Sequence, residues 1–292
     1  MAMNWQVFKT RALTALVFVA VMLGGLLWNK WSFFILFSVI HWGCWLEYQR
    51  LVKRIDTSYT QISSFHAYGF ILAGWSLMLF CAGDVYRVGG ITLHAIGLVA
   101  VIIFAFALPL VEILFSKQFN LKHISYSALG LLYISLSWSL MIGIRSMKGI
   151  WIAGNATHFE TGWILPLIII FSIWINDTMA YITGSLIGRT PFSKVSPKKT
   201  IEGTLGGAVL CVAVIGALAY YMQLSVMHVC IIAAIAAVAG TAGDLLESKL
   251  KRMANVKDSG HIMPGHGGFL DRFDSLLIAT PAIWLYVMFA MK

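Results

Sequence analysis

The sequence predicts an all-α fold, a polytopic bundle of about nine transmembrane helices. The 292 residues are 59% hydrophobic and only 11% charged, whereas soluble domains carry about 25% charged residues. The apolar residues also fall into nine stretches of membrane-spanning length, for which about 20 mostly apolar residues are needed. A soluble core of this size could not bury so much apolar surface, so we expect a membrane protein.

The nine predicted spans are separated by polar loops. In chain order they cover residues 11–28, 31–46, 65–83, 91–111, 124–144, 163–182, 203–221, 225–246 and 275–291. Lys9 and Arg11 before an apolar run resemble the start of a signal peptide. A second apolar run follows Trp28 and Trp31 at once, with no small-residue cleavage site. We therefore expect residues 11–28 to remain as the first span.

The distribution of Lys and Arg predicts the orientation. With the N-terminus inside and nine alternating spans, 16 of these residues fall in inside loops and five fall outside. Cytoplasmic loops carry the excess of positive charge, so we expect an inner-membrane protein with a cytoplasmic N-terminus and an outside C-terminus. The net charge of +9 is dispersed over loops between spans, which argues against a nucleic-acid partner.

The polar residues divide the chain into two predicted regions. Residues 1–160 form a transmembrane scaffold, in which Glu47 and Glu112 lie at span ends and receive no chemical role. Residues 161–292 form the catalytic region, because two inside loops, 183–203 and 247–274, are rich in Gly, Lys, Asp and His.

Acidic residues occur within or beside the apolar spans of the second region. Asp177 lies within one predicted span and Asp244 near the end of another. Intramembrane acids are costly and mark functional sites by default. Asp244, Glu247 and Ser248 also stand at positions i, i+3 and i+4, which share one face of a helix.

A second acidic face begins the last span, where Asp271 and Asp274 are three residues apart. Two such faces brought together would form an oxygen-rich nest. Mg²⁺ takes hard oxygen ligands, usually one or two carboxylates together with substrate phosphates. The alternative interpretation is that the acids only pair with Lys251, Arg252 and Arg272.

Basic residues lie between and beside the acidic faces. Lys251, Arg252 and Lys257 are suited to phosphate groups, because Arg offers a bidentate fork and Lys a point charge. Lys198 and Lys199 follow Ser-Pro in the other loop. Adjacent lysines at headgroup level also bind anionic lipid without specificity, and this alternative stays open for the pair.

The stretch Pro264–Gly268 contains three glycines around His266, so it cannot form a helix interior. Glycines let the backbone approach a ligand closely, and N–H groups at the start of a following helix bind phosphate. Neither GxxxxGK[ST] nor GxGxxG occurs in the chain, which argues against a soluble nucleotide-binding domain. His261 and His266 allow a two-histidine metal site, but we expect hydrogen bonding to phosphate or carboxylate.

A run of 27 residues, 248–274, closely resembles the signature of phosphatidate cytidylyltransferases (CDP-diacylglycerol synthases), with the family spacing and no gaps. Its matching blocks are Ser248-Lys249-Leu250-Lys251-Arg252, Lys257-Asp258-Ser259-Gly260, Pro264-Gly265-His266-Gly267-Gly268 and Asp271-Arg272-Phe273-Asp274. Upstream residues also resemble that family: Asp177, Ala180-Tyr181, Gly188-Arg189, Ser196-Pro197-Lys198-Lys199-Thr200 and Glu202-Gly203. The resemblance covers roughly residues 170–280.

The resemblance implies a reaction and a set of roles. The phosphate of phosphatidic acid attacks the α-phosphorus of CTP, and diphosphate leaves. The implied catalytic residues are Asp244, Lys251, Arg252, Lys257, Asp271 and Asp274. The implied substrate-binding residues are Asp177, Lys198, Lys199, Ser248, His266, Gly267, Gly268 and Arg272. Asp244, Asp271 and Asp274 would hold Mg²⁺, with room for a second cation; a homodimer within the lipid membrane is left open.

Two other classes of function stay open at this point. An ion-coupled transporter would use Asp177 and Asp244 as coupling carboxylates, but it leaves the clustering of acids, bases and glycines in inside loops unexplained. CTP-dependent polyprenol kinases and archaeal-type CDP-lipid synthases are nearer alternatives. The D-G-x-x-A-R context of CDP-alcohol transferases is missing from the sequence.

Overall fold

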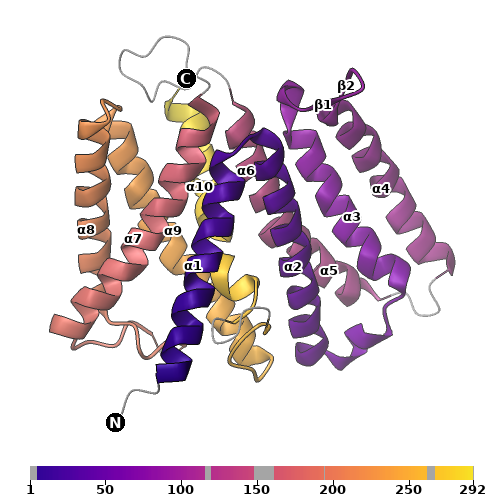
Figure 1. Cartoon of the computed structure of the whole chain (residues 1–292). Helices are drawn as coiled ribbons and strands as arrows, with labels where there is room; N and C mark the ends of the chain where they lie inside the picture. Colours follow the sequence, from indigo (N-terminus) through magenta and orange to yellow (C-terminus); the bar gives the residue numbers. More distant parts are fainter. Residues whose placement is uncertain (1–4, 116–119, 148–160, 194, 262–266, 292) are drawn as a thin grey trace. The chain divides into compact units, whose positions relative to one another are not determined.

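The computed structural model describes residues 5–115, 120–147, 161–193, 195–261 and 267–291, and most of them are helical (Figure 1). The chain divides into two compact units. The first comprises Met1–Ile142 with Leu250–Phe273, and the second comprises Gly143–Lys249 with Asp274–Lys292. Much of the motif segment, as we call residues 248–274, therefore belongs with the N-terminal half. The predicted division of roles at residue 160 stays a prediction.

The first unit is built mainly of antiparallel helical pairs, among which α3 and α4 lie side by side (Figure 1). Its elements are α1 (Trp5–Leu27), α2 (Lys30–Ile55), α3 (Ser64–Cys81), β1 (Arg87–Val88), β2 (Ile91–Thr92), α4 (Leu93–Phe115), α5 (Leu121–Gly130) and the part of α6 (Leu136–Ser146) up to Ile142. A 3-10 turn spans Thr57–Gln61, and the π-helical turn Leu131–Ser135 joins α5 to α6.

Helix α2 begins where its sequence provides a cap. The Asn29 side chain accepts the N–H of Ser32 at 2.9 Å, and the Ser32 hydroxyl accepts the N–H of Asn29 at 3.0 Å. This reciprocal capping box satisfies two helix-terminal donors. Farther along, Trp45 is fully buried and donates to the Ser135 hydroxyl at 2.8 Å, so the polar end of the indole has a partner.

The second unit contains α7 (Ile164–Ile187), α8 (Ile201–Tyr221), most of α9 (Val226–Met253) and most of α10 (Leu270–Ala290). Helices α7 and α8 pack closely. A Cβ at Gly207 would lie 2.6 Å from Cβ of Ala180, and one at Gly203 would lie 2.8 Å from the Ala180 carbonyl oxygen. Small residues four apart let membrane helices approach in this way.

The all-α, polytopic membrane fold is confirmed. Seven helical stretches of the described residues are long and apolar enough to cross a membrane. The apolar stretch Ala12–Leu27 of α1 is shorter, and the ends of α2 are charged. The predicted second span ended at residue 46, whereas α2 continues to Ile55 because charged residues such as Glu47 and Lys53 are good helix formers.

Candidate active site

The loop between α7 and α8 is held at its base by the first turn of α8. Glu202 accepts the backbone N–H groups of Arg189 and Thr190, each at 3.1 Å, and the Thr190 hydroxyl at 2.7 Å. The Phe192 N–H donates to the Lys199 carbonyl at 2.7 Å, so the two arms of the loop pair. This arrangement fixes the backbone that carries Lys199.

Lys199 forms an ion pair with Asp244 of α9. The other oxygen of Asp244 accepts the Ser248 hydroxyl at 3.2 Å, so the predicted i, i+4 relationship is realised. Asp177 of α7 accepts the side-chain amide of its neighbour Asn176 at 3.4 Å. Lys199 from one predicted loop is therefore brought to the predicted face of Asp244 and Ser248 in the second unit.

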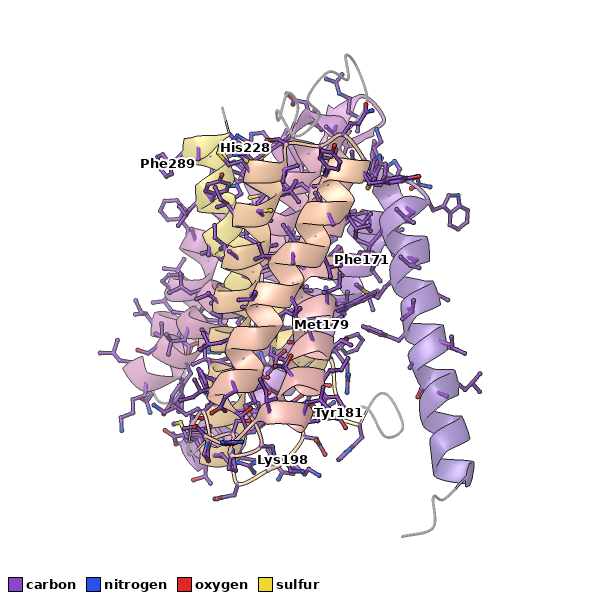
Figure 2. The ribbon with its side chains drawn as sticks, turned by 90° about the vertical axis from the view of Figure 1, so that its left-hand side faces the viewer. Phe171, Met179, Tyr181, Lys198, His228 and Phe289 are labelled. Carbon is purple, nitrogen blue, oxygen red and sulfur yellow. The ribbon has the colours of Figure 1, made fainter. Side chains whose placement is uncertain are left out.

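The ion pair also fixes the relative placement of two loops. Helices α8 and α9 both have spanning length, so the loop before α8 and the end of α9 lie at the same end of the unit. Figure 2 shows Lys198 near Tyr181 at one end of the unit, and His228 and Phe289 at the other. His228 lies 2.7 Å from the Tyr286 hydroxyl, so α10 ends opposite the Lys199–Asp244 pair.

In the first unit, Asp271 organises the motif segment. Its Oδ1 accepts the Lys251 ammonium at 2.6 Å. Its Oδ2 accepts the backbone N–H of Gly268 at 2.8 Å and that of Ser259 at 2.9 Å, and it also lies 2.9 Å from the Ser259 hydroxyl oxygen. The carboxylate thus joins the end of α9, the following loop and the start of α10.

Glu47 of α2 reaches the same segment. It is 1% exposed, and its carboxylate accepts the Ser259 hydroxyl at 2.7 Å, the Phe269 N–H at 3.0 Å and the Leu270 N–H at 2.9 Å. Helix-terminal N–H groups lack intrahelical partners. Glu47 therefore caps the start of α10 with a buried carboxylate.

The carboxylates suit a hard cation in chemical kind. Among the residues described, however, no group of three or more His, Cys, Asp or Glu side chains is placed to hold a metal ion. Lys199 neutralises Asp244 and Lys251 neutralises Asp271. Mg²⁺ binding by Asp244, Asp271 and Asp274 stays a prediction, and so does a second cation.

The comparison with known proteins decides the family. A model of the cytidylyltransferase family matches residues 9–290. The chain belongs to this family. It therefore contains the motif segment and the Lys199 loop within one family domain, which confirms the family expected from the motif.

Several relatives of this cytidylyltransferase-family chain carry the name phosphatidate cytidylyltransferase. The one from Synechocystis is 36% identical over 59% of this chain and 64% of its own length. The one from Bacillus subtilis is 33% identical over 76% of this chain and 77% of its own. The one from Staphylococcus saprophyticus is 29% identical over 94% and 97%.

The remaining predicted residues have diverse placements within this family member. Lys198, Arg252, Lys257 and Arg272 are exposed, whereas Asp274 is buried and accepts its neighbour Ser275 N–H at 2.7 Å. Gly267 adopts a φ of +80°, which favours glycine. His266 lies outside the described residues. Contacts of these residues with substrate stay predictions.

Two features of the site were missed from sequence. Glu47 was given no role, because an acid at a span end resembles a headgroup contact and its partners are more than 200 residues away. The N–H groups of Gly268, Phe269 and Leu270, expected to be available to phosphate, donate to carboxylates of Asp271 and Glu47 instead. The role of Glu47 is visible only in the structure, from its burial and its hydrogen bonds.

Proposed function

We propose that the chain transfers the cytidylyl group of CTP to phosphatidic acid, yielding CDP-diacylglycerol and diphosphate. An oxygen of the phosphatidic acid phosphate forms a bond to the α-phosphorus of CTP. The bond from that phosphorus to the oxygen bridging to the β-phosphate breaks, and diphosphate leaves with the electron pair. The match of the cytidylyltransferase family to residues 9–290 carries this proposal.

The basic side chains have the properties that this reaction needs. Nucleotidyl transfer depends on charge neutralisation and alignment more than on covalent chemistry. Lys199 and Lys251 are oriented by their ion pairs with Asp244 and Asp271, and charge-assisted hydrogen bonds to phosphate are strong. Lys198, Arg252 and Lys257 are exposed and accessible to an incoming triphosphate.

The resemblance of residues 248–274 to the family signature makes Mg²⁺ part of the proposal, with Asp244, Asp271 and Asp274 as the residues that would hold it. When bound, the cation neutralises phosphate charge and polarises phosphoryl oxygens. The support is the alternation of acidic and basic residues along the sequence from 244 to 274, together with two proposed substrates that are both anionic. The Ser248 hydroxyl donates to Asp244, and Asp177 is a further acidic residue of the second unit.

The proposed site faces the cytoplasm, where CTP is present. The support is the excess of Lys and Arg in the inside loops, 16 against five, which follows the positive-inside rule. The N-terminus then lies inside and the C-terminus outside the inner membrane.

A reconstitution experiment tests the activity. Purified protein in phosphatidylcholine vesicles is supplied with CTP and Mg²⁺, with or without phosphatidic acid, and diphosphate release is measured. We expect release only when phosphatidic acid is present. Solute uptake into the vesicles without CTP would support the transporter instead, and a phosphorylated alcohol with CDP as product would support a polyprenol kinase.

A further inference from the structure

The Glu47 carboxylate is enclosed by the motif segment. Its three hydrogen bonds come from Ser259 and from the N–H groups that begin α10. A buried carboxylate is tolerated only when donors surround it, and a helix N-terminus favours negative charge. The donors therefore satisfy the buried Glu47 carboxylate, which in turn holds the loop and the helix start together.

Two motif glycines make room for this carboxylate. A Cβ at Gly260 would collide with Oε1 of Glu47, and a Cβ at Gly268 would collide with both carboxylate oxygens. At each position the three nearest atoms all belong to Glu47. The absence of a side chain at these two positions is thus explained by a residue of α2, without any ligand.

The Ser259 hydroxyl connects Glu47 to the catalytic candidates. Its oxygen lies 2.7 Å from Oε2 of Glu47 and 2.9 Å from Oδ2 of Asp271, and Oδ1 of Asp271 accepts Lys251. A shift of Glu47 would therefore move Ser259 and the start of α10, and with them the Asp271–Lys251 pair.

We infer that Glu47 is a positioning residue, which sets the places of Asp271 and Lys251 through Ser259 and the first turn of α10. This inference rests on the proposed function for its kinetic consequence. Its structural consequence, an ordered start of α10, does not depend on which reaction is catalysed.

Kinetics and hydrogen exchange together test the inference on the full-length protein. Glu47→Gln preserves shape but removes the charge and turns an amide toward N–H donors. We expect kcat to fall about a hundredfold, as small displacements of catalytic groups do. The amides of residues 267–273 should exchange faster while the melting temperature of the whole protein stays near that of wild type. Asp84→Asn, an exposed acid of the first unit, is the matched control.

A rescue experiment separates positioning from a general loss of packing. Gly268→Ala should lower kcat about a hundredfold. When Glu47→Asp is added to this variant, the shorter side chain withdraws the carboxylate from the new methyl group. The double variant should then recover about tenfold in kcat, since contacting residues couple strongly. Gly24→Ala, where an added Cβ meets nothing within 4 Å, should have no effect. Wild-type kcat and exchange in Glu47→Gln, or absence of rescue, would overturn the inference. If the amides of residues 267–273 exchange faster in Glu47→Gln than in wild type, but the wild-type protein makes no CDP-lipid, the proposed function would be rejected and the structural inference would stand.

An independent feature of the first unit is an apolar pocket of about 330 Å³ between α3, α4 and the α5–α6 segment. Its lining residues on α4 run from Val101 to Glu112, about 16 Å along a helix axis at 1.5 Å per residue. Half of a hydrocarbon core about 30 Å thick is of similar length. The pocket therefore has the length of one acyl chain. Helix α4 is a candidate span whose surface is largely unburied, so lipid chains would surround it.

A carboxylate lies at one end of this pocket. Glu112 is 9% exposed, and its Oε2 lies 3.1 Å from Nδ1 of His66. His66 Nε2 lies 2.8 Å from the Ser127 hydroxyl, which lies 2.7 Å from the Tyr59 hydroxyl. Glu112 also lines the pocket, close to the end of α4 at Phe115.

We propose that this pocket binds one chain of diacylglycerol, whose hydroxyl group donates a hydrogen bond to Glu112. A hydroxyl group donates without bringing a phosphate anion beside the carboxylate. Phosphatidylethanolamine carries such an anion, and phosphatidylcholine carries one and has no donor.

Photolabelling tests the pocket. The protein in phosphatidylcholine nanodiscs is irradiated with a diacylglycerol that carries a diazirine at its chain end, and adducts are mapped by mass spectrometry. We expect saturable labelling of the pocket lining, competed by diacylglycerol but not by added phosphatidylethanolamine or phosphatidylcholine. Ala105→Trp, which fills the pocket, should remove the adduct, and Glu112→Gln should weaken it. Ile103→Trp, on the exposed side of the same helix, should leave it unchanged. Equal labelling in both tryptophan variants, or equal competition by all lipids, would reject the site.

Discussion

Lys251 and Asp271 form an ion pair in which Nζ lies 2.6 Å from Oδ1, joining the last turn of α9 to the first turn of α10. Both side chains are mostly buried, with 15% and 9% of their surfaces exposed. The other oxygen of Asp271 accepts donors from Ser259 and Gly268. The two residues that the motif assigns to catalysis are thus oriented by each other and by the loop between them.

Asp271→Asn should lower kcat about a thousandfold, or ~4 kcal/mol at 1.36 kcal/mol per tenfold. The amide cannot neutralise Lys251, and its NH₂ group faces donors. Turnover is measured on protein that elutes as a single species in detergent, with Asp84→Asn as control. A kcat near that of wild type would contradict the assigned role of Asp271.

Removal of divalent cations should abolish turnover. Phosphatidic acid and CTP are both anionic, and carboxylates are concentrated beside the basic loop, so an added cation is needed for charge neutralisation. Activity is measured in excess EDTA and after addition of Mg²⁺, which should restore it. In Asp274→Asn, the Mg²⁺ concentration for half-maximal activity should rise if this residue is a ligand. Full activity in EDTA would exclude the metal.

Lys199 and Asp244 should act as a pair. Lys199→Ala and Asp244→Asn should each lower kcat/KM about a hundredfold, and the double variant should be little worse than either single variant, because contacting residues are not additive. Lys122→Ala is the matched control, since Lys122 is an exposed lysine of the first unit with no predicted role in the site, and its effect should be much smaller. Additive losses in a double-mutant cycle would show that the ion pair has no functional consequence.

Labelling from one side of the membrane tests the orientation. In a cysteine-free background, cysteines at the exposed positions Arg189 and Met253 should react with an impermeant maleimide only in inside-out vesicles. A cysteine at Val88, in the exposed β1–β2 turn, should react only from the outside. Opposite reactivities of Arg189→Cys and Met253→Cys would contradict the shared end on which Lys199 and Asp244 meet.

The sequence was sufficient for the helical class and for the approximate spans, because backbone groups within a membrane must be satisfied internally and long apolar runs then become helices. It did not determine where α2 ends, since a hydropathy limit at residue 46 does not stop a helix that continues in charged residues. The capping box at Asn29 and Ser32 is a local pattern and could have marked its start.

The candidate site was only partly predictable. Asp244 and Asp271 stood out because acids are costly near a membrane, but their partners Lys199 and Lys251 depend on packing between distant segments. Glu47 shows the limit most clearly. Its partner Ser259 lies 212 residues away, and no local pattern links an acid on α2 to glycines of the motif segment.

The central claim is that the cytidylyl group of CTP is transferred to phosphatidic acid, and the fate of each CTP phosphorus tests it most directly. The purified protein is incubated with phosphatidic acid, Mg²⁺ and CTP labelled at either the α- or the γ-phosphorus, and lipid and aqueous products are separated. We predict that the α-label appears in CDP-diacylglycerol and that the γ-label appears only in diphosphate. A γ-label in the lipid fraction, or no labelled lipid from either of the two labelled CTP samples, would contradict the proposed reaction.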